Sequence, residues 1–289
     1  MKNIYYLLII ALVLMITSCK ARRTTTESML YDSIDLSESP HNINPFDTIG
    51  EGIPIFYNMY LSVEISSLFD VADVYYSAEL LNSIGKTSDY ITSDQKATNL
   101  GVYAVDLSYA KVFDQLEVAG QYLSAMQQLA LEMGIPSKYF TGIISRFENN
   151  IDNRDSIMSI ANDVYYDVNN YLNENERYST SALVIMGGWV EAMHIASSVI
   201  EESQNPEIFE RYAEQKSSIN NLISLLSGHK DNSVINEYIN YLTPIKDKLN
   251  NLDINFEDTE DSQALIEKYR NEIKNISVDI KKIRKKIVT

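Results

Sequence analysis

Residues that break α-helices are scarce in this chain, and this scarcity constrains its fold more than any other feature. Only 10 Gly and 6 Pro occur among 289 residues, and both types are unfavourable inside helices. Alternating apolar and polar runs bounded by turn residues, which are typical of β-strands, do not recur. From about residue 54 onward we therefore expect an all-α fold of about eight or nine helices, arranged as a multi-helix bundle or as stacked helical hairpins.

The few breakers mark the expected helix boundaries. The expected helices span about 54–84, 94–133, 137–150, 153–175, 179–203 and 206–228. Gly85 is expected to end the first helix, and Ser93 is expected to cap the second. A bend or break near Gly120 is expected in the second helix because of its length. Asn205, followed by Pro206 at the first helical position, is a strong start signal.

The last 80 residues carry two apolar stripes whose members alternate in spacing between three and four residues. The stripes are Ile235, Tyr238, Leu242, Ile245, Leu249 and Leu252, and Tyr269, Ile273, Ile276, Ile280, Ile283 and Ile287. Such spacing is typical of coiled-coil packing. Two arrangements stay open: antiparallel helices joined through the stripes, or each stripe packed on the main domain. Pro244 predicts a kink or a restart of the first helix, with Thr243 as a cap.

The first 18 residues have the pattern of a targeting segment. A positively charged start is followed by an apolar run of 13 residues, Ile4–Ile16, which is short for a transmembrane helix. The next residues complete Ile16-Thr17-Ser18-Cys19, which resembles the bacterial lipobox. The resemblance implies a lipoprotein signal peptide over 1–18, cleavage before Cys19, and acylation of Cys19 with fatty acids such as palmitate. The alternative is an ordinary signal peptide followed by an incidental Cys.

Cys19 is the single Cys of the chain, so no disulfide can form within it. Lipidation of its thiol would also exclude a Cys nucleophile, Cys-ligated zinc and iron–sulfur chemistry. Several acyl tails give stable anchoring, so the first partner expected is membrane lipid through acylated Cys19.

The residue after the Cys bears on which membrane is used. Lys20 stands where the inner-membrane retention signal of enterobacterial lipoproteins has Asp, and the acidic export signal of Bacteroidota surface lipoproteins is absent. These comparisons imply a lipid-anchored protein of the cell envelope, at the outer membrane and facing the periplasm.

Residues 19–52 are polar and rich in turn residues, and they are expected to form a flexible tether. A helical core domain is expected over 53–204, and a C-terminal helical segment over 205–289. Ser33, Thr48 and Ser156 lie in Asp-Ser/Thr-aliphatic triplets that resemble the O-glycosylation acceptor of Bacteroidota. The resemblance implies O-glycosylation at these three residues.

Two ten-residue segments are similar to each other. Residues 101–110 and 187–196 both begin with Gly, and both have an aromatic residue third and Ala tenth. Gly inside a helix costs about 1 kcal/mol relative to Ala, so we expect another helix or a ligand to approach the backbone here. The two segments could face each other across the core. Their phrases resemble segments of uncharacterised helical envelope lipoproteins from Bacteroidota, a resemblance that implies no known activity.

Asp106, Glu191 and His194 lie among apolar neighbours in these segments and are the candidate ligand or metal residues. Buried charges must be paired, hydrogen-bonded or neutralised. Glu191 and His194 have the Glu-x-x-His spacing, which di-iron bundles use twice together with two further Glu. A second such motif is missing, so core packing competes with a metal site, and no cofactor is expected.

The formal net charge of −16 argues against binding to nucleic acid. Residues 265–289 nevertheless hold eight basic and three acidic residues. This basic end either docks on the acidic body or contacts lipid phosphates or another anionic polymer of the envelope.

Nucleotide-binding and hydrolase motifs are absent from the sequence. We therefore expect a membrane-anchored envelope lipoprotein that is not an enzyme and that acts as a helical binding or scaffold protein, with an envelope protein as partner. The alternatives are a carrier of a small ligand, or a metal-dependent enzyme built around Asp106, Glu191 and His194.

Overall fold

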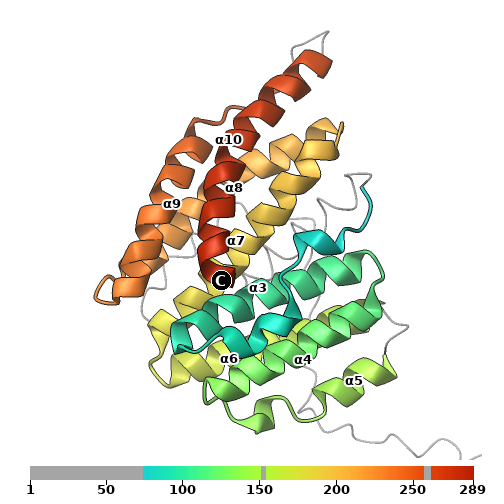
Figure 1. Cartoon of the computed structure of the whole chain (residues 1–289), viewed down its shortest axis with the longest axis vertical. Helices are drawn as coiled ribbons and strands as arrows, with labels where there is room; N and C mark the ends of the chain where they lie inside the picture. The colour runs from blue at the N-terminus through green and yellow to red at the C-terminus, as the bar shows by residue number, and fades with distance from the viewer. Residues whose placement is uncertain (1–73, 151–153, 257–261) are drawn as a thin grey trace, which may run out of the picture. The chain divides into compact units, whose positions relative to one another are not determined.

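The computed structural model describes residues 74–150, 154–256 and 262–289. All of them belong to one compact unit of the chain, Thr48–Thr289. In these residues all regular secondary structure is helical and no strand occurs, which confirms the all-α prediction (Figure 1). The α-helices are α3 (Ser93–Val112), α4 (Leu116–Glu132), α5 (Ile143–Asn149), α6 (Arg154–Glu174), α7 (Tyr178–Glu202), α8 (Pro206–Ser227), α9 (Ser233–Asn251) and α10 (Ser262–Val288). Three short 3-10 helices are η1 (Ala78–Leu80), η2 (Ile84–Asp89) and η3 (Ser137–Tyr139).

Several predictions fall on residues outside this description. They are the signal peptide over 1–18, the tether over 19–52, Cys19, Ser33 and Thr48. Ser156 lies in the first turn of α6, and its side chain is outside the described part. The predicted lipidation and O-glycosylation therefore stay predictions.

Helices α3 and α7 form the most extensive helix pair of the described fold. Helix α4 packs on α3, and α10 packs on α7. Helices α8, α9 and α10 contact one another, and α8 also contacts α7 (Figure 1). Helix α7 therefore packs both on α3, which precedes it in the chain, and on α8 and α10, which follow it.

Helix α7 is also, among the described residues, the one helix long and apolar enough to cross a membrane. Of its most apolar stretch, 94% is buried inside the protein. A helix at the centre of a folded bundle is also long and apolar on all sides.

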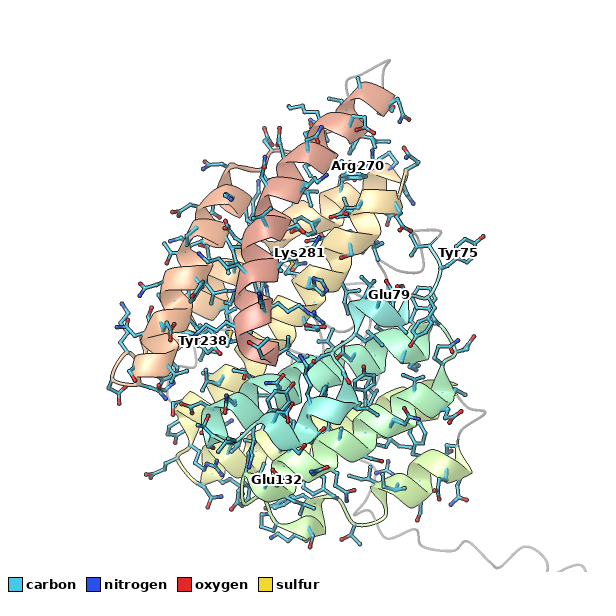
Figure 2. All side chains as sticks on the ribbon, viewed as in Figure 1. Tyr75, Glu79, Glu132, Tyr238, Arg270 and Lys281 are labelled. Carbon is cyan, nitrogen blue, oxygen red and sulfur yellow. The ribbon has the colours of Figure 1, made fainter. Side chains whose placement is uncertain are left out.

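The segment before α3 differs from the prediction. A helix was expected to reach Ile84 and end at Gly85, but residues 74–92 contain only η1 and η2, and Gly85 lies inside η2. The segment begins at the surface, where the side chain of Tyr75 is 93% exposed and projects away from the helices (Figure 2). The cause of the difference is visible at Asn82, whose backbone N–H and C=O bond to side chains of α3 and α4 instead of to a helix of their own.

The break between α3 and α4 was predicted near Gly120 but lies at residues 113–115. Asp114 has φ of 55° there, a left-handed conformation that Asp tolerates better than most residues. Gly120 lies inside α4, and a Cβ on it would be 2.9 Å from the Cε1 atom of Phe147. That glycine therefore makes room for an aromatic ring instead of bending the helix.

The helix ends test the cap predictions. The N-cap of α3 is Thr92 and not Ser93, because Thr92 and Gln95 form a reciprocal capping box. Asn205 caps α8 as predicted, with its Oδ1 accepting the N–H of Glu207 at 3.0 Å. Both C-terminal stripes are buried as predicted, through contacts of α9 with α8 and α10 and of α10 with α7.

Pro244 does not restart the first of these helices, because α9 continues through it. Thr243 is not a cap either, since its hydroxyl donates to the Ile239 carbonyl at 2.8 Å, within the helix.

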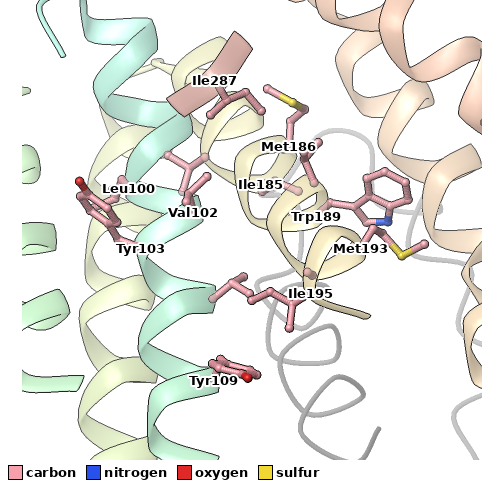
Figure 3. Packing of buried hydrophobic residues seen from close by; sticks show 14 of the residues in the cluster. Leu100, Val102, Tyr103, Tyr109, Ile185, Met186, Trp189, Met193, Ile195 and Ile287 are labelled. Carbon is pink, nitrogen blue, oxygen red and sulfur yellow. The ribbon is translucent and has the colours of Figure 1, made fainter. Parts of the chain in front are cut away.

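The two glycine-containing segments face each other, as the sequence suggested. A Cβ on Gly101 would lie 1.9 Å from the Val184 carbonyl oxygen, and a Cβ on Gly187 would lie 2.0 Å from the Thr98 carbonyl oxygen. The backbones of α3 and α7 therefore approach too closely for any other residue at these two positions. Figure 3 shows buried side chains of both helices around this contact, with Ile287 of α10 beside them.

Gly187→Ala is expected to destabilise the protein by about 3 kcal/mol or more, because its Cβ would overlap rigid backbone. Gly188→Ala is the matched control, since the nearest atom to its Cβ would lie 3.4 Å away, and Ala could gain up to about 1 kcal/mol of helix propensity. Denaturant unfolding followed by the fluorescence of Trp189 measures both. Equal effects of the two substitutions would contradict the proposed backbone contact.

Candidate functional site

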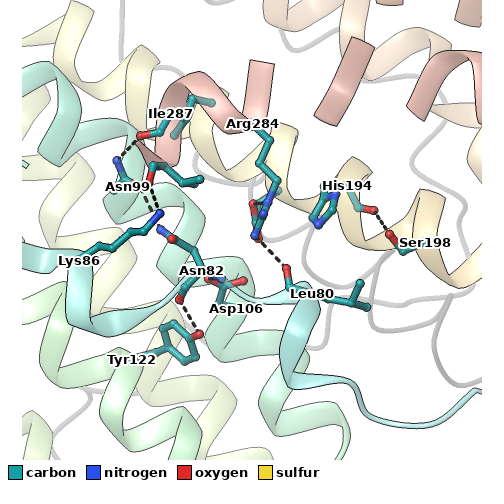
Figure 4. Close-up of polar contacts among 12 residues, drawn as sticks. Leu80, Asn82, Lys86, Asn99, Asp106, Tyr122, His194, Ser198, Arg284 and Ile287 are labelled. Atoms are coloured by element: carbon teal, nitrogen blue, oxygen red, sulfur yellow. Dashed lines mark hydrogen bonds and ion pairs between the residues drawn. The ribbon is translucent and has the colours of Figure 1, made fainter. Parts of the chain in front are cut away.

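The three candidate residues all lie in the core. Asp106 in α3 and Glu191 in α7 are both 0% exposed, and His194, one turn after Glu191, is 8% exposed. The α3–α7 contact described above brings Asp106 and Glu191 into direct interaction. Figure 4 shows Asp106 and His194 near Arg284, which enters from α10.

Arg284 neutralises Glu191. Its Nε donates to Glu191 Oε2 at 2.6 Å, and its Nη2 donates to Oε1 at 2.7 Å. Nη2 also donates to the Leu80 carbonyl at 2.8 Å. A bidentate Arg–carboxylate pair is among the strongest polar interactions in proteins. Arg284 is 16% exposed and Glu191 is wholly enclosed, so water screens this pair poorly.

Asp106 is the second carboxyl group of the site, and it has no cation of its own. Its Oδ2 accepts the Asn82 N–H at 3.1 Å, while Oδ1 has no donor among the described residues. Burial raises the pKa of Asp106 well above its ordinary value, and the adjacent Glu191 carboxylate raises it further. We therefore assign a proton to Asp106, which makes its carboxyl group a donor toward the adjacent Glu191 carboxylate.

We call Asp106, Glu191 and Arg284 the buried ion cluster. Burial also raises the pKa of Glu191, but the hydrogen bonds and charge of Arg284 oppose this. With Arg284 cationic, Glu191 anionic and Asp106 protonated, the cluster is electrically neutral. Its groups satisfy one another, which is how buried charges are stabilised in folded proteins.

His194 lies beside the cluster without joining it. Burial lowers its pKa to about 3, and the charges of Arg284 and Lys281 contribute in the same direction. The imidazole is therefore neutral at physiological pH. Its Nδ1 is buried without a hydrogen-bond partner among the described residues.

No group of three or more His, Cys, Asp or Glu residues in the described part of the chain is placed to hold a metal ion. Both oxygens of Glu191 are engaged by Arg284. A cation could reach this carboxylate only by displacing the guanidinium group.

The sequence interpretation missed Arg284, Asn82 and Tyr122 as parts of this region. Arg284 was treated as one charge of a basic run, although its position is four residues after Ile280 and three before Ile287, on the face of the apolar stripe. That position was the available signal. Nothing in the local sequence marks Asn82 or Tyr122, because their contacts depend on the tertiary fold.

Three other lysines of the basic run contact acidic or aromatic residues of the same protein. Lys281 pairs with Glu201 at 3.2 Å, and Lys286 pairs with Glu237 at 2.7 Å. Lys282 lies 5.4 Å from the centre of the Tyr241 ring. These contacts agree with docking of the basic end on the acidic body, although exposed pairs of this kind contribute at most about 1 kcal/mol each.

A surface depression of about 290 Å³ lies where α4 approaches η3 and α5, with Gln127, Phe140 and Ile144 among its lining residues. It contains none of the candidate site residues, and it is open to solvent. Such a depression does not enclose a ligand as the pockets of small-molecule carriers do.

Comparison of the chain with protein-family models, with curated proteins and with solved structures finds no match.

Arg284→Met is expected to destabilise the protein by about 3–5 kcal/mol, because it leaves a buried carboxylate without its cation. The matched control is Lys285→Met in the same turn of α10, where the side chain is exposed and the expected change is within about 0.5 kcal/mol. Denaturant unfolding of the two variants makes the comparison. A loss below about 1 kcal/mol in Arg284→Met would show that the buried pair is not structurally important.

Proposed function

We propose that this protein is a bacterial envelope lipoprotein, anchored through acylated Cys19, whose helical domain acts as a non-enzymatic binding or scaffold protein. The lipobox-like sequence that ends at Cys19 supports the anchor. The localisation we propose is the outer membrane, with the domain facing the periplasm, and the partner class is an envelope protein.

The observation that supports a non-enzymatic role is that the carboxyl groups of the buried ion cluster are enclosed by the protein. An acid–base catalyst needs a group within hydrogen-bond reach of a substrate. Asp106 and Glu191 are wholly enclosed, and the nearest cation, Arg284, is already bonded to both oxygens of Glu191. The two carboxyl groups that could act as an acid or a base, Asp106 and Glu191, are thus engaged in contacts that hold α3, α7 and α10 together.

Cys19→Ala is expected to abolish acylation and leave the signal segment uncleaved, because the lipidated thiol is lost. Ser18→Ala is the matched control, since it keeps a small residue before the Cys and should be processed normally. Labelling cells with a fatty acid such as palmitate, together with the intact mass of the purified protein, measures both changes. Normal processing of Cys19→Ala would refute the anchor.

The binding role is tested separately, by crosslinking in the native envelope followed by identification of the crosslinked proteins. We expect outer-membrane or periplasmic proteins to be recovered with the native protein, and the outer-membrane proteins among them to be lost with Cys19→Ala. Recovery of cytoplasmic proteins alone would contradict the proposed compartment even if Cys19 is acylated.

A further inference from the structure

The C-terminal turn of α10 is bound to the segment that leads into α3. We define the C-terminal junction as the contacts of residues 284–288 with residues 77–89 and with the start of α3. The last carbonyls of a helix lack donors within the helix. Here Lys86 donates to the Val288 carbonyl at 2.8 Å, and Asn99 donates to the Ile287 carbonyl at 2.9 Å (Figure 4).

Asn82 connects the segment to the helices beneath it. Its side-chain amide donates to Tyr90 at 2.9 Å and to Asn99 Oδ1 at 3.1 Å. Its carbonyl accepts the Tyr122 hydroxyl at 2.8 Å, and its N–H donates to Asp106. Asn82 is 3% exposed, so loss of these bonds would leave buried polar groups unpaired.

Asp106 therefore touches both halves of the junction. One carboxyl oxygen holds Asn82 in the 77–89 segment. The Asp106 carboxyl group also interacts with that of Glu191, which holds Arg284 of the C-terminal turn. Arg284 also donates to the Leu80 carbonyl, so it bonds directly to the 77–89 segment.

We propose that the C-terminal junction is a proton-dependent conformational device. With one proton on the buried ion cluster the junction is closed, and loss of that proton separates residues 77–89 from residues 285–288, while Arg284 stays bonded to Glu191. This inference concerns the helical domain and does not depend on the membrane anchor.

The charge count gives the physical reason. Two carboxyl groups share one guanidinium group, so the cluster is neutral with one proton and carries a buried negative charge without it. An uncompensated buried charge is strongly unfavourable. The free energy of this buried charge falls most readily when water reaches Asp106. Water can reach it only if residues 77–89, which cover it, move.

The groups that face the cluster do not supply a second buried cation. The titratable and charged groups around it are Glu191 and His194 of α7, Arg284 and Lys281 of α10, Tyr122 of α4, Tyr103 of α3, and Tyr76 and Tyr90 of the preceding segment. Burial raises the pKa of each of these tyrosines, which are therefore neutral. His194 is neutral as well, and Lys281 is half exposed and paired with Glu201.

The direction of the pH dependence follows from the raised pKa of Asp106. For Asp106 the closed state binds the proton more tightly than the open state, so its contribution to closure is fully present below about pH 4, the ordinary range for Asp. It weakens as the pH rises toward and through the raised pKa. Opening should remain local because residues 77–89 contain only two short 3-10 helices, and side chains hold them in place.

The test is hydrogen exchange of the full-length protein across a pH series, corrected for the intrinsic exchange rate of each amide. In the wild type the opening constants of peptides covering 77–89 and 284–288 should rise together, by up to tenfold per pH unit. Peptides from α4 should rise less. If only one of the two junction peptides opens, or neither responds to pH, the proposal is overturned without any variant.

Asp106→Asn provides the second arm, because the amide keeps the shape of the protonated carboxyl and cannot lose its proton. Its junction peptides should show no pH dependence, whereas Asp114→Asn, an exposed control at the end of α3, should behave like the wild type. A pH dependence in Asp106→Asn equal to that of the wild type would overturn the assignment of the proton.

Discussion

The ion pair between Glu191 and Arg284 is the interaction on which the rest of the described fold depends. Glu191 lies in α7, at the centre of the fold, and Arg284 lies near the end of α10, 93 residues later. A carboxylate with no exposure cannot stay ionised without a cation at this place. The need to supply that cation therefore fixes how the last helix docks, and Arg284 in turn positions Leu80 and the segment around it.

A second constraint is the close approach of α3 and α7 at Gly101 and Gly187. This approach brings Asp106 against Glu191, so the glycines and the buried ion cluster are parts of one arrangement. A larger residue at either glycine would push the helices apart and separate the two carboxyl groups. The polar cluster is thus a consequence of a packing contact, and three helices enclose it.

Much of the fold could be predicted because it depends on local signals. Apolar spacing identified the C-terminal stripes, and Asn205 with Pro206 identified the start of α8. Mid-helix glycines suggested that the two segments now seen in α3 and α7 could face each other. The segment over 74–92 could not be predicted, because Asn82 exchanges helical bonds for bonds to Tyr122 and Asp106, which are far away in sequence. Arg284 was missed for a different reason: a basic run suggests a solvated end, although the spacing of Arg284 from Ile280 and Ile287 places it on the face of the apolar stripe.

The account is tested most directly by a double-mutant cycle on the central pair. The free energy of unfolding is measured for Glu191→Gln, for Arg284→Met and for the double variant, with Trp189 fluorescence as the probe. If the two residues stabilise the fold through each other, the double variant should lose about 2 kcal/mol less than the sum of the single losses. Additive losses, within about 0.5 kcal/mol, would show that the pair does not act as a unit and would contradict the account.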